Sequence, residues 1–246
     1  MKRTARGFSL VEMAVVLVIF GLLLSGLMMT LTAQQASQRA QETRRLLTQA
    51  KEALIGYATI NGRLPCPADP ALASGAAGAG AERAPTATGC TGGQSGVLPW
   101  ATLGLPEHDA WARRITYRVS ALHSRTVDPA RTASQYGCAT PPATAPAQSA
   151  FALCSPGDAS VRVAAAGATL AGAVPAVLVS HGGNGFGASL PAGTAMAASG
   201  DADEIANHDG DAVFVDRTPS DTYDDLTDWV ASPVLMNRMV QSGRLP

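Results

Sequence analysis

The chain has 246 residues, which is enough for one domain of ordinary size in addition to a terminal segment. Its formal net charge is −1, so the chain lacks the strong overall positive charge that would indicate a nucleic-acid partner. Charged residues make up 15% and aromatic residues 5% of the chain, and Ala and Gly are abundant. We therefore expect a modest hydrophobic core with long irregular connections.

The first predicted element is an apolar helix behind a short basic head formed by Lys2, Arg3 and Arg6. The apolar run ends at Leu31 and has about 24 residues, which at about 1.5 Å per residue would span the roughly 30 Å core of a bilayer. Basic residues precede the run and none follow it closely. This asymmetry predicts a single-pass inner-membrane protein with a cytoplasmic N-terminus and a periplasmic outer domain.

Glu12 is the one charged residue inside the apolar run. A carboxylate at the middle of a membrane helix costs about 2.5–3.5 kcal/mol, and the cost should be smaller near the end where Glu12 lies. A positive charge at the same depth in the membrane would offset the cost of the Glu12 carboxylate. Cleavage after Gly7 would free the α-amino group of Phe8, which could meet Glu12 of a neighbouring helix in a bundle staggered by one step. We therefore predict that Glu12 promotes assembly.

Residues 6–13, Arg-Gly-Phe-Ser-Leu-Val-Glu-Met, resemble the class III signal of type IV prepilins and type II secretion pseudopilins. The resemblance implies that residues 1–7 are a leader, that a prepilin peptidase cleaves between Gly7 and Phe8, and that Phe8 is N-methylated. It further implies that residues 8–31 are a transmembrane and polymerisation helix. The implied partners are other pilin or pseudopilin subunits, the peptidase, the membrane and an inner-membrane assembly platform.

Two simpler interpretations of the N-terminus are an ordinary secretory signal peptide and a plain one-pass anchor. A signal peptide has an apolar region of about 7–15 residues followed by small residues at the cut. Residues 32–36 could supply such a site, but the apolar run is too long and Glu12 lies where a signal peptide would not place it. A plain anchor leaves Glu12 unexplained.

The helical pattern continues beyond Leu31. Small and apolar residues recur at steps of three and four from Ala36 to Tyr57, the opposite face is rich in Gln, Arg and Glu, and no Pro occurs in residues 8–64. We predict one helix over residues 8–60, roughly 80 Å long, whose amphipathic part, residues 32–60, packs on a sheet. Two helices with a hinge near residues 21–26 are an alternative, because each mid-helix Gly costs about 1 kcal/mol relative to Ala.

Residues 61–246 are predicted to form the outer domain, and they contain all four cysteines. Residues 68–96 read as a long loop that a Cys66–Cys90 disulfide would close, and residues 121–157 read as a second loop in which Cys138 and Cys154 would pair. Two free thiols are the alternative for the first loop, and four cysteines allow three connectivities. The spacings match no zinc site, and disulfides fit an oxidising periplasm.

The outer domain shows short strand patterns at residues 114–119, 161–163, 176–180 and 212–215, and a helix pattern from about residue 233 to 243. Three segments, residues 98–119, 180–185 and 223–230, are similar to parts of pseudopilin-like outer domains. The predicted fold class is α+β and pilin-like, with a long N-terminal helix on a small antiparallel sheet and long loops. Trp100 and Trp111 are expected to pack in the core.

Residues 181–187, His-Gly-Gly-Asn-Gly-Phe-Gly, could suggest a phosphate loop or an esterase oxyanion loop. No Lys-Ser/Thr pair or helix pattern follows, and the chain has no G-x-S-x-G motif. We therefore expect a tight turn in which Gly supplies positive φ.

Residues 201–228 carry many carboxylates and one basic residue, Arg217. Some type II secretion pseudopilins hold calcium in a C-terminal loop, and the resemblance therefore makes calcium the one candidate cofactor. Carboxylate oxygens are suitable calcium ligands, but the EF-hand spacing is missing. The alternative is a solvated acidic loop. The candidate ligands are Asp201, Asp203, Asp209 and Asp211.

The predicted function is a structural subunit of a type IV pilus or type II secretion pseudopilus, and the large outer domain favours a minor subunit. The alternative is a pilus-tip adhesin or DNA-uptake receptor. DNA binding needs a basic patch, and only Arg113, Arg114 and Arg118 are clustered, so no nucleic-acid partner is expected. An anchored hydrolase would need a nucleophile elbow, a zinc motif or an acid–base pair, so we do not expect an enzyme.

Overall fold

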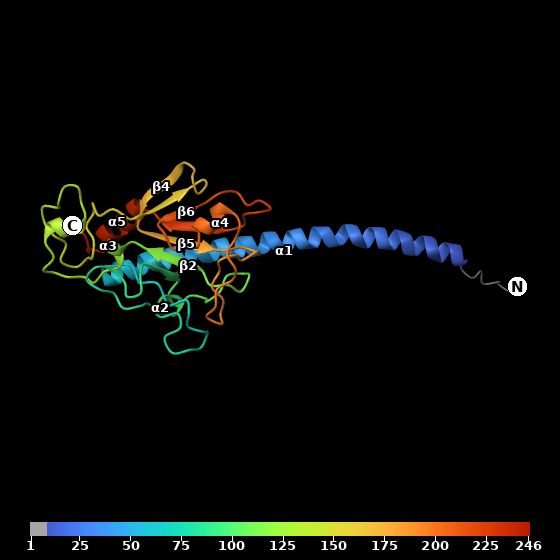
Figure 1. Cartoon of the computed structure of the whole chain (residues 1–246), viewed down its shortest axis with the longest axis horizontal. Helices are drawn as coiled ribbons and strands as arrows, with labels where there is room; N and C mark the ends of the chain where they lie inside the picture. The colour runs from blue at the N-terminus through green and yellow to red at the C-terminus, as the bar shows by residue number, and fades with distance from the viewer. Residues whose placement is uncertain (1–8) are drawn as a thin grey trace. The chain divides into compact units, whose positions relative to one another are not determined.

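A computed structural model of the chain describes residues 9–246, with the exception of the side chains of residues 23–33 (Figure 1). The chain divides into two compact units, with the boundary between Gln41 and Glu42. Helix α1, Leu10–Asn61, has 52 residues and contributes to both units.

Helix α1 runs without a break from Leu10 to Asn61, so the prediction of one helix is confirmed and the two-helix alternative is not needed. Its end follows from the sequence. Gly62 adopts the left-handed φ of 71°, and its N–H donates to the carbonyl of Ala58 at 2.8 Å. Glycine commonly closes a helix in this way, and Pro65 prevents its continuation.

In the second unit, α1 buries one stripe of its surface, formed by Leu47, Ala50, Leu54 and Ala58. Their spacing of three and four residues places them on one face of the helix. Lys51 donates to both carboxylate oxygens of Asp228 at 2.8 Å, which joins this part of α1 to strand β7, Leu226–Val230. The later part of the predicted amphipathic segment therefore packs against the sheet of its own chain, whereas residues 34–39 are exposed.

Two small sheets form the rest of the second unit. The first is antiparallel and has the order β1-β2-β5-β7, with β1 at Ser95–Val97, β2 at Thr116–Val119 and β5 at Ala176–Ser180. The second has the order β4-β3-β6, with β3 at Ala159–Arg162, β4 at Thr169–Val174 and β6 at Val213–Val215. Strands β3 and β6 are parallel. The α+β class is confirmed, but the second, mixed sheet was not predicted.

The two sheets share a core. Strand β5 is buried along its whole length, which matches the apolar run in residues 176–179. Alternate residues of a strand point to the same face, so Val177 and Val179 face together into this core. The cluster is formed by Ala159, Val161, Val174, Val177, Val179 and Phe214.

Short helices complete the second unit: α2 at Trp100–Leu103, α3 at Ala121–Ser124, a 3-10 turn at Ala133–Tyr136, α4 at Ala202–Ala206 and α5 at Ser232–Gln241. Helix α5 confirms the predicted C-terminal helix and is followed by Gly243 at positive φ. The structure joins Cys66 to Cys90 and Cys138 to Cys154, which is the local pairing preferred from the sequence.

Among the helices that the structure describes, none is both long and apolar enough to cross a membrane. This finding contradicts the predicted location of the chain as a single-pass inner-membrane protein. The prediction counted an apolar run up to Leu31. The part of that run whose side chains are described, residues 9–22, covers roughly 20 Å at 1.5 Å per residue, which is less than a bilayer core of roughly 30 Å.

Candidate functional site

The first candidate site is the start of α1, where Ser9 and Glu12 form two reciprocal hydrogen bonds. The Ser9 N–H donates to Glu12 Oε2 at 2.8 Å, and the Glu12 N–H donates to Ser9 Oγ at 3.2 Å. This arrangement is a capping box, in which two residues satisfy each other's free N–H groups at a helix start. It also places the carboxylate at the positive end of the helix dipole.

Sequence reasoning identified Glu12 but missed Ser9, although the pattern Ser-x-x-Glu before an apolar run is a known signal for a capping box. The predicted cleavage and methylation residues, Gly7 and Phe8, lie outside the described residues. The predicted cut comes one residue before the capping box in the sequence.

The second feature of the first unit is its exposed apolar surface. The side chains of residues 10–22 are exposed, and the large apolar ones among them are between 43% and 88% accessible to solvent. Exposed apolar surfaces of this kind mark interaction sites. The exposed large side chains are Leu10, Val11, Met13, Val15, Val16, Leu17, Val18, Ile19, Phe20 and Leu22.

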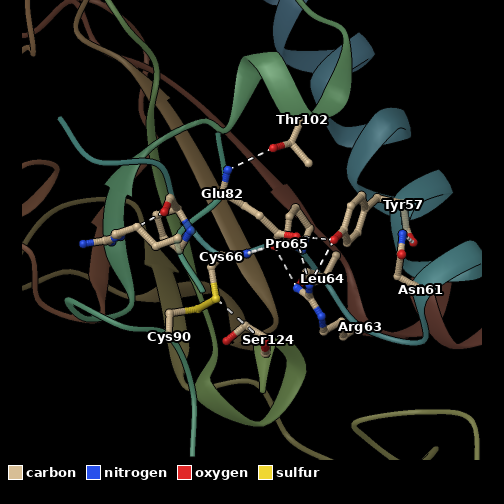
Figure 2. A network of polar contacts seen from close by, with 12 residues as sticks. Tyr57, Asn61, Arg63, Leu64, Pro65, Cys66, Glu82, Cys90, Thr102 and Ser124 are labelled. Atoms are coloured by element: carbon tan, nitrogen blue, oxygen red, sulfur yellow. Dashed lines mark hydrogen bonds and ion pairs between the residues drawn. A yellow bond between two sulfur atoms is a disulfide. The ribbon is translucent and has the colours of Figure 1, made fainter. Parts of the chain in front are cut away.

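A third site ties the end of α1 to the loop that follows it, and Glu82 is its centre (Figure 2). One carboxylate oxygen accepts from the Tyr57 hydroxyl at 2.5 Å, and the two oxygens accept from the Arg63 guanidinium at 2.9 Å each. The N–H of Cys66 donates to the same carboxylate at 3.0 Å, and the Glu82 N–H donates to Thr102 Oγ1 at 2.9 Å. The helix end, the Cys66–Cys90 disulfide and the long loop therefore meet at one carboxylate.

The electrostatics of this network favour an ionised Glu82. Burial by itself would raise the pKa of Glu82, but the hydrogen bonds from Arg63, Tyr57 and Cys66 outweigh burial and hold the pKa below its ordinary value. Burial and the nearby carboxylate raise the pKa of the Tyr57 hydroxyl to about 12. A neutral tyrosine and a charged carboxylate match the observed direction of hydrogen bonding.

The four acidic residues predicted as calcium ligands are not brought together. The Asp201 side chain caps α4, and Arg217 lies 3.4 Å from Asp201 and 2.7 Å from Asp203. The side chains of Asp209 and Asp211 accept from backbone N–H groups two residues further along the chain, in an exposed turn. Two of these carboxylates are therefore paired with Arg217, and the other two shape a turn.

A different acidic group does converge. Oxygens of Glu204, Asp224 and Asp225 lie within 4.8 Å of one another. Glu204 comes from α4, and the two aspartates directly precede β7. The predicted tight turn at residues 181–187 contacts this group, because the Asn184 N–H donates to Asp224 Oδ2 at 2.8 Å. No spacing in the sequence signals the group, because Glu204 and Asp224 are brought together only by the fold.

The comparisons with known proteins concern the N-terminus. The family model described as the prokaryotic N-terminal methylation motif matches residues 2–28. No curated protein and no solved structure matches the chain. The match is consistent with a type IV prepilin- or pseudopilin-like protein, and such a motif implies assembly with other pilin subunits and with membrane machinery.

Proposed function

We propose that the protein is a structural subunit, of the minor class, of a type IV pilus or a type II secretion pseudopilus. In this proposal a prepilin peptidase cleaves between Gly7 and Phe8, Phe8 is methylated, and α1 carries the subunit into a filament. The single observation that carries the proposal is the position of Glu12. It lies in the first turn of a helix with exposed apolar side chains and inside the matched methylation motif.

The physical step is the replacement of solvent around Glu12 by a neighbouring subunit. Cleavage would create a positive α-amino group on Phe8, four residues before the carboxylate. When apolar helices pack together, both charges leave water, and each then needs the other. Removing one partner of a buried ion pair costs about 3–5 kcal/mol, so the pair would strongly select subunits that dock in the right register.

The second unit would then be the part of the subunit that determines its surface in the filament. The Lys51–Asp228 ion pair and the Glu82 network join the C-terminal part of α1 to the rest of this unit, and the Cys66–Cys90 disulfide closes the loop that follows the helix. We propose that these contacts keep the unit folded while the helix is pulled during assembly.

The structure provides little support for the alternative of a DNA-uptake receptor. Arg114 is fully buried and bonds to Glu107 at 2.8 Å. Arg113 donates to the carbonyls of Gly182 and Gly183, and Arg118 lies 3.5 Å from Asp158. The three clustered arginines therefore serve contacts within the chain. A tip adhesin would need a binding surface of its own, and we do not propose one.

The experiment that tests the proposal is mass spectrometry of the N-terminal peptide of the protein from its native host, together with immunogold labelling of surface filaments. We expect a mature chain that begins with methylated Phe8 and gold particles along or at the tip of filaments. A mature chain that still carries residues 1–7 and an unmodified Phe8 would contradict the proposal.

A further inference from the structure

We propose that His123, Arg125 and Arg131 form a binding site for one small inorganic anion, which we assign as chloride. The three side chains belong to the second unit, in the segment that runs from α3 to the Cys138–Cys154 disulfide. The inference does not depend on the proposed role in a filament. Three properties support it: a buried positive charge without a carboxylate, hydrogen-bond donors without acceptors, and aromatic rings that close the space around them.

The positive charge of the group is buried without a carboxylate. Arg125 and Arg131 are 6% and 7% exposed, and neither forms an ion pair with any described residue. Asp128 lies between them in the sequence, but it is exposed and its carboxylate accepts from a backbone N–H two residues further along the chain. Buried charges are normally paired, so these two call for an anion. The acceptors that they do have are the uncharged backbone carbonyls of Thr126, Gln135 and Ala150.

The two guanidinium groups lie close together. Arg125 Nε and Arg131 Nη1 donate to the same acceptor, the carbonyl of Ala150, at 2.9 and 3.3 Å. Both groups also lie over the ring of Tyr136, at 5.5 and 6.0 Å from its centroid. Burial and the neighbouring charge of Arg131 lower the pKa of Arg125 to about 10, so both arginines are still charged at neutral pH. An anion beside them would offset their mutual repulsion.

Donors of the group also lack acceptors. Arg125 Nη2 is buried and has no hydrogen-bond partner among the described residues, and the same is true of both ring nitrogens of His123. The His123 ring is fully buried and packs on Phe151, with their centroids 4.6 Å apart, directly after the carbonyl that binds both arginines. Burial and the charge of Arg125 lower the pKa of His123 to about 3, so its ring is neutral and carries one N–H. Buried polar atoms are nearly always satisfied, so these donors call for an acceptor.

The surroundings favour a monoatomic anion. Tyr136 and Phe151 are fully buried, so two aromatic rings border the group and leave little space beside it. A phosphate has several strong acceptor oxygens, and in a buried site each of them would need its own donor. The group offers only Arg125 Nη2 and one N–H of His123 as donors without a partner among the described residues. A chloride ion can accept from both at once, because it has no preferred direction of bonding.

The test uses the full chain in a mild detergent, dialysed against sodium gluconate and titrated with sodium chloride at constant ionic strength. Gluconate is too bulky for a closed site, so it serves as the reference anion. Broadening of the chloride NMR line measures binding, and thermal unfolding measures its effect on stability. We expect saturable binding of one chloride per chain. At chloride tenfold above Kd, the Tm should rise by about 3–6 °C.

One variant and a matched control locate the ion. Arg125→Gln removes a buried charge and the unpartnered Nη2, so the affinity for chloride should fall at least about tenfold. The control is Arg238→Gln, which also removes one arginine from the second unit, but from a side chain on α5 that is 53% exposed. This control should keep the affinity and the Tm shift of the wild type.

The inference is overturned if chloride shows no saturable binding at up to about 1 M, where salt screens exposed charges beyond about 3 Å. It is also overturned if Arg125→Gln keeps the affinity of the wild type, or if Arg238→Gln loses it. Should Arg125→Gln fail to fold, His123→Phe gives the same comparison, because it keeps a ring against Phe151 and removes the N–H. Its affinity for chloride should fall by about three- to tenfold, and an unchanged affinity would overturn the inference.

Discussion

The two parts of helix α1 differ in where they find their packing partners. Residues 10–22 expose large apolar side chains, whereas Leu47, Ala50, Leu54 and Ala58 of the same helix are buried in the second unit. Both parts are helical for the same local reason, the absence of proline and of helix-ending signals until Gly62 and Pro65. Helix formation and helix burial are therefore separate questions. In the proposed function, the N-terminal part finds its partner in another subunit.

The largest effect should come from removing the charge of the N-terminal part while keeping its helix start. Glu12→Gln can still accept the Ser9 N–H, since Gln replaces Glu in capping boxes. Loss of one partner of a buried ion pair costs about 3–5 kcal/mol, so we expect at least about a hundredfold less incorporation into filaments. Immunoblots of sheared filaments measure how much of the variant is incorporated.

The control for this prediction is Ser9→Ala, which removes one cap hydrogen bond and keeps the carboxylate. A lost cap costs about 1 kcal/mol of helix stability. Assembly of this variant should remain close to that of the wild type. If Ser9→Ala assembles worse than Glu12→Gln, capping is what matters at this end of α1, and the assembly role of the charge is wrong.

A matched pair of leucines tests the comparison directly. Leu54 is fully buried and Leu17 is 67% exposed. Leu54→Ala should lower the free energy of unfolding of the isolated chain by about 2–5 kcal/mol, because it leaves a cavity. Leu17→Ala should change it by less than about 0.5 kcal/mol. Denaturant unfolding of both variants checks this, and equal losses would show that the two parts of α1 do not differ as described.

The Glu82 network provides a further test of this difference, at the C-terminal end of the buried part of α1. Because the folded pKa of Glu82 is lowered, its stabilising effect is fully present above the ordinary value of 4.5 and is lost as the pH falls through the folded pKa. Glu82→Gln should cost about 1–3 kcal/mol at neutral pH and should reduce the acid dependence of stability below about pH 4.5.

Unfolding curves between pH 7 and pH 3 test this prediction, with Glu52→Gln as the control. Glu52 lies on the same helix, and its side chain is 57% exposed. This variant also loses one carboxylate, but it leaves the Glu82 network intact. An equal change in acid dependence for the two variants would contradict the role given to Glu82.

The smallest effect is expected at the ion pair between α1 and β7. Lys51 and Asp228 are bonded at 2.8 Å, but their side chains are 28% and 23% exposed. Pairs that water still reaches contribute about 0–1 kcal/mol. A double-mutant cycle with Lys51→Met and Asp228→Asn should give a coupling energy in this range. A coupling above about 2 kcal/mol would mean that this contact, rather than the buried leucines, holds the C-terminal part of α1.

The elements that were predicted well have strong local signals. Helix α1 follows from its periodicity, and β5 follows from the β-branched run at Ala176–Ser180. Strand β4 was missed because Thr169–Val174 is mostly exposed and contains a glycine, so its sequence does not alternate. Strand β1 has three residues and depends on pairing with β2.

The candidate sites also differ in how far local sequence could indicate them. Glu12 stands out because it is a lone charge in an apolar run, so the sequence alone makes it a candidate, and its role in assembly stays a prediction. The group formed by Glu204, Asp224 and Asp225 could not be predicted, because α4 and the start of β7 meet only in the folded unit. The four predicted calcium ligands were chosen as neighbours in an acidic sequence, and their carboxylates have different partners in the fold. Arg217 neutralises two of them.

The capping box at the start of α1 has a consequence for maturation. The amide that binds Glu12 belongs to the peptide bond between Phe8 and Ser9, which is C-terminal to the proposed scissile bond. Hydrolysis before Phe8 and a methyl group on its nitrogen would therefore leave this amide and its acceptor intact. The precursor and the mature chain can share one starting point for the helix, so the leader can be removed without refolding the segment behind it.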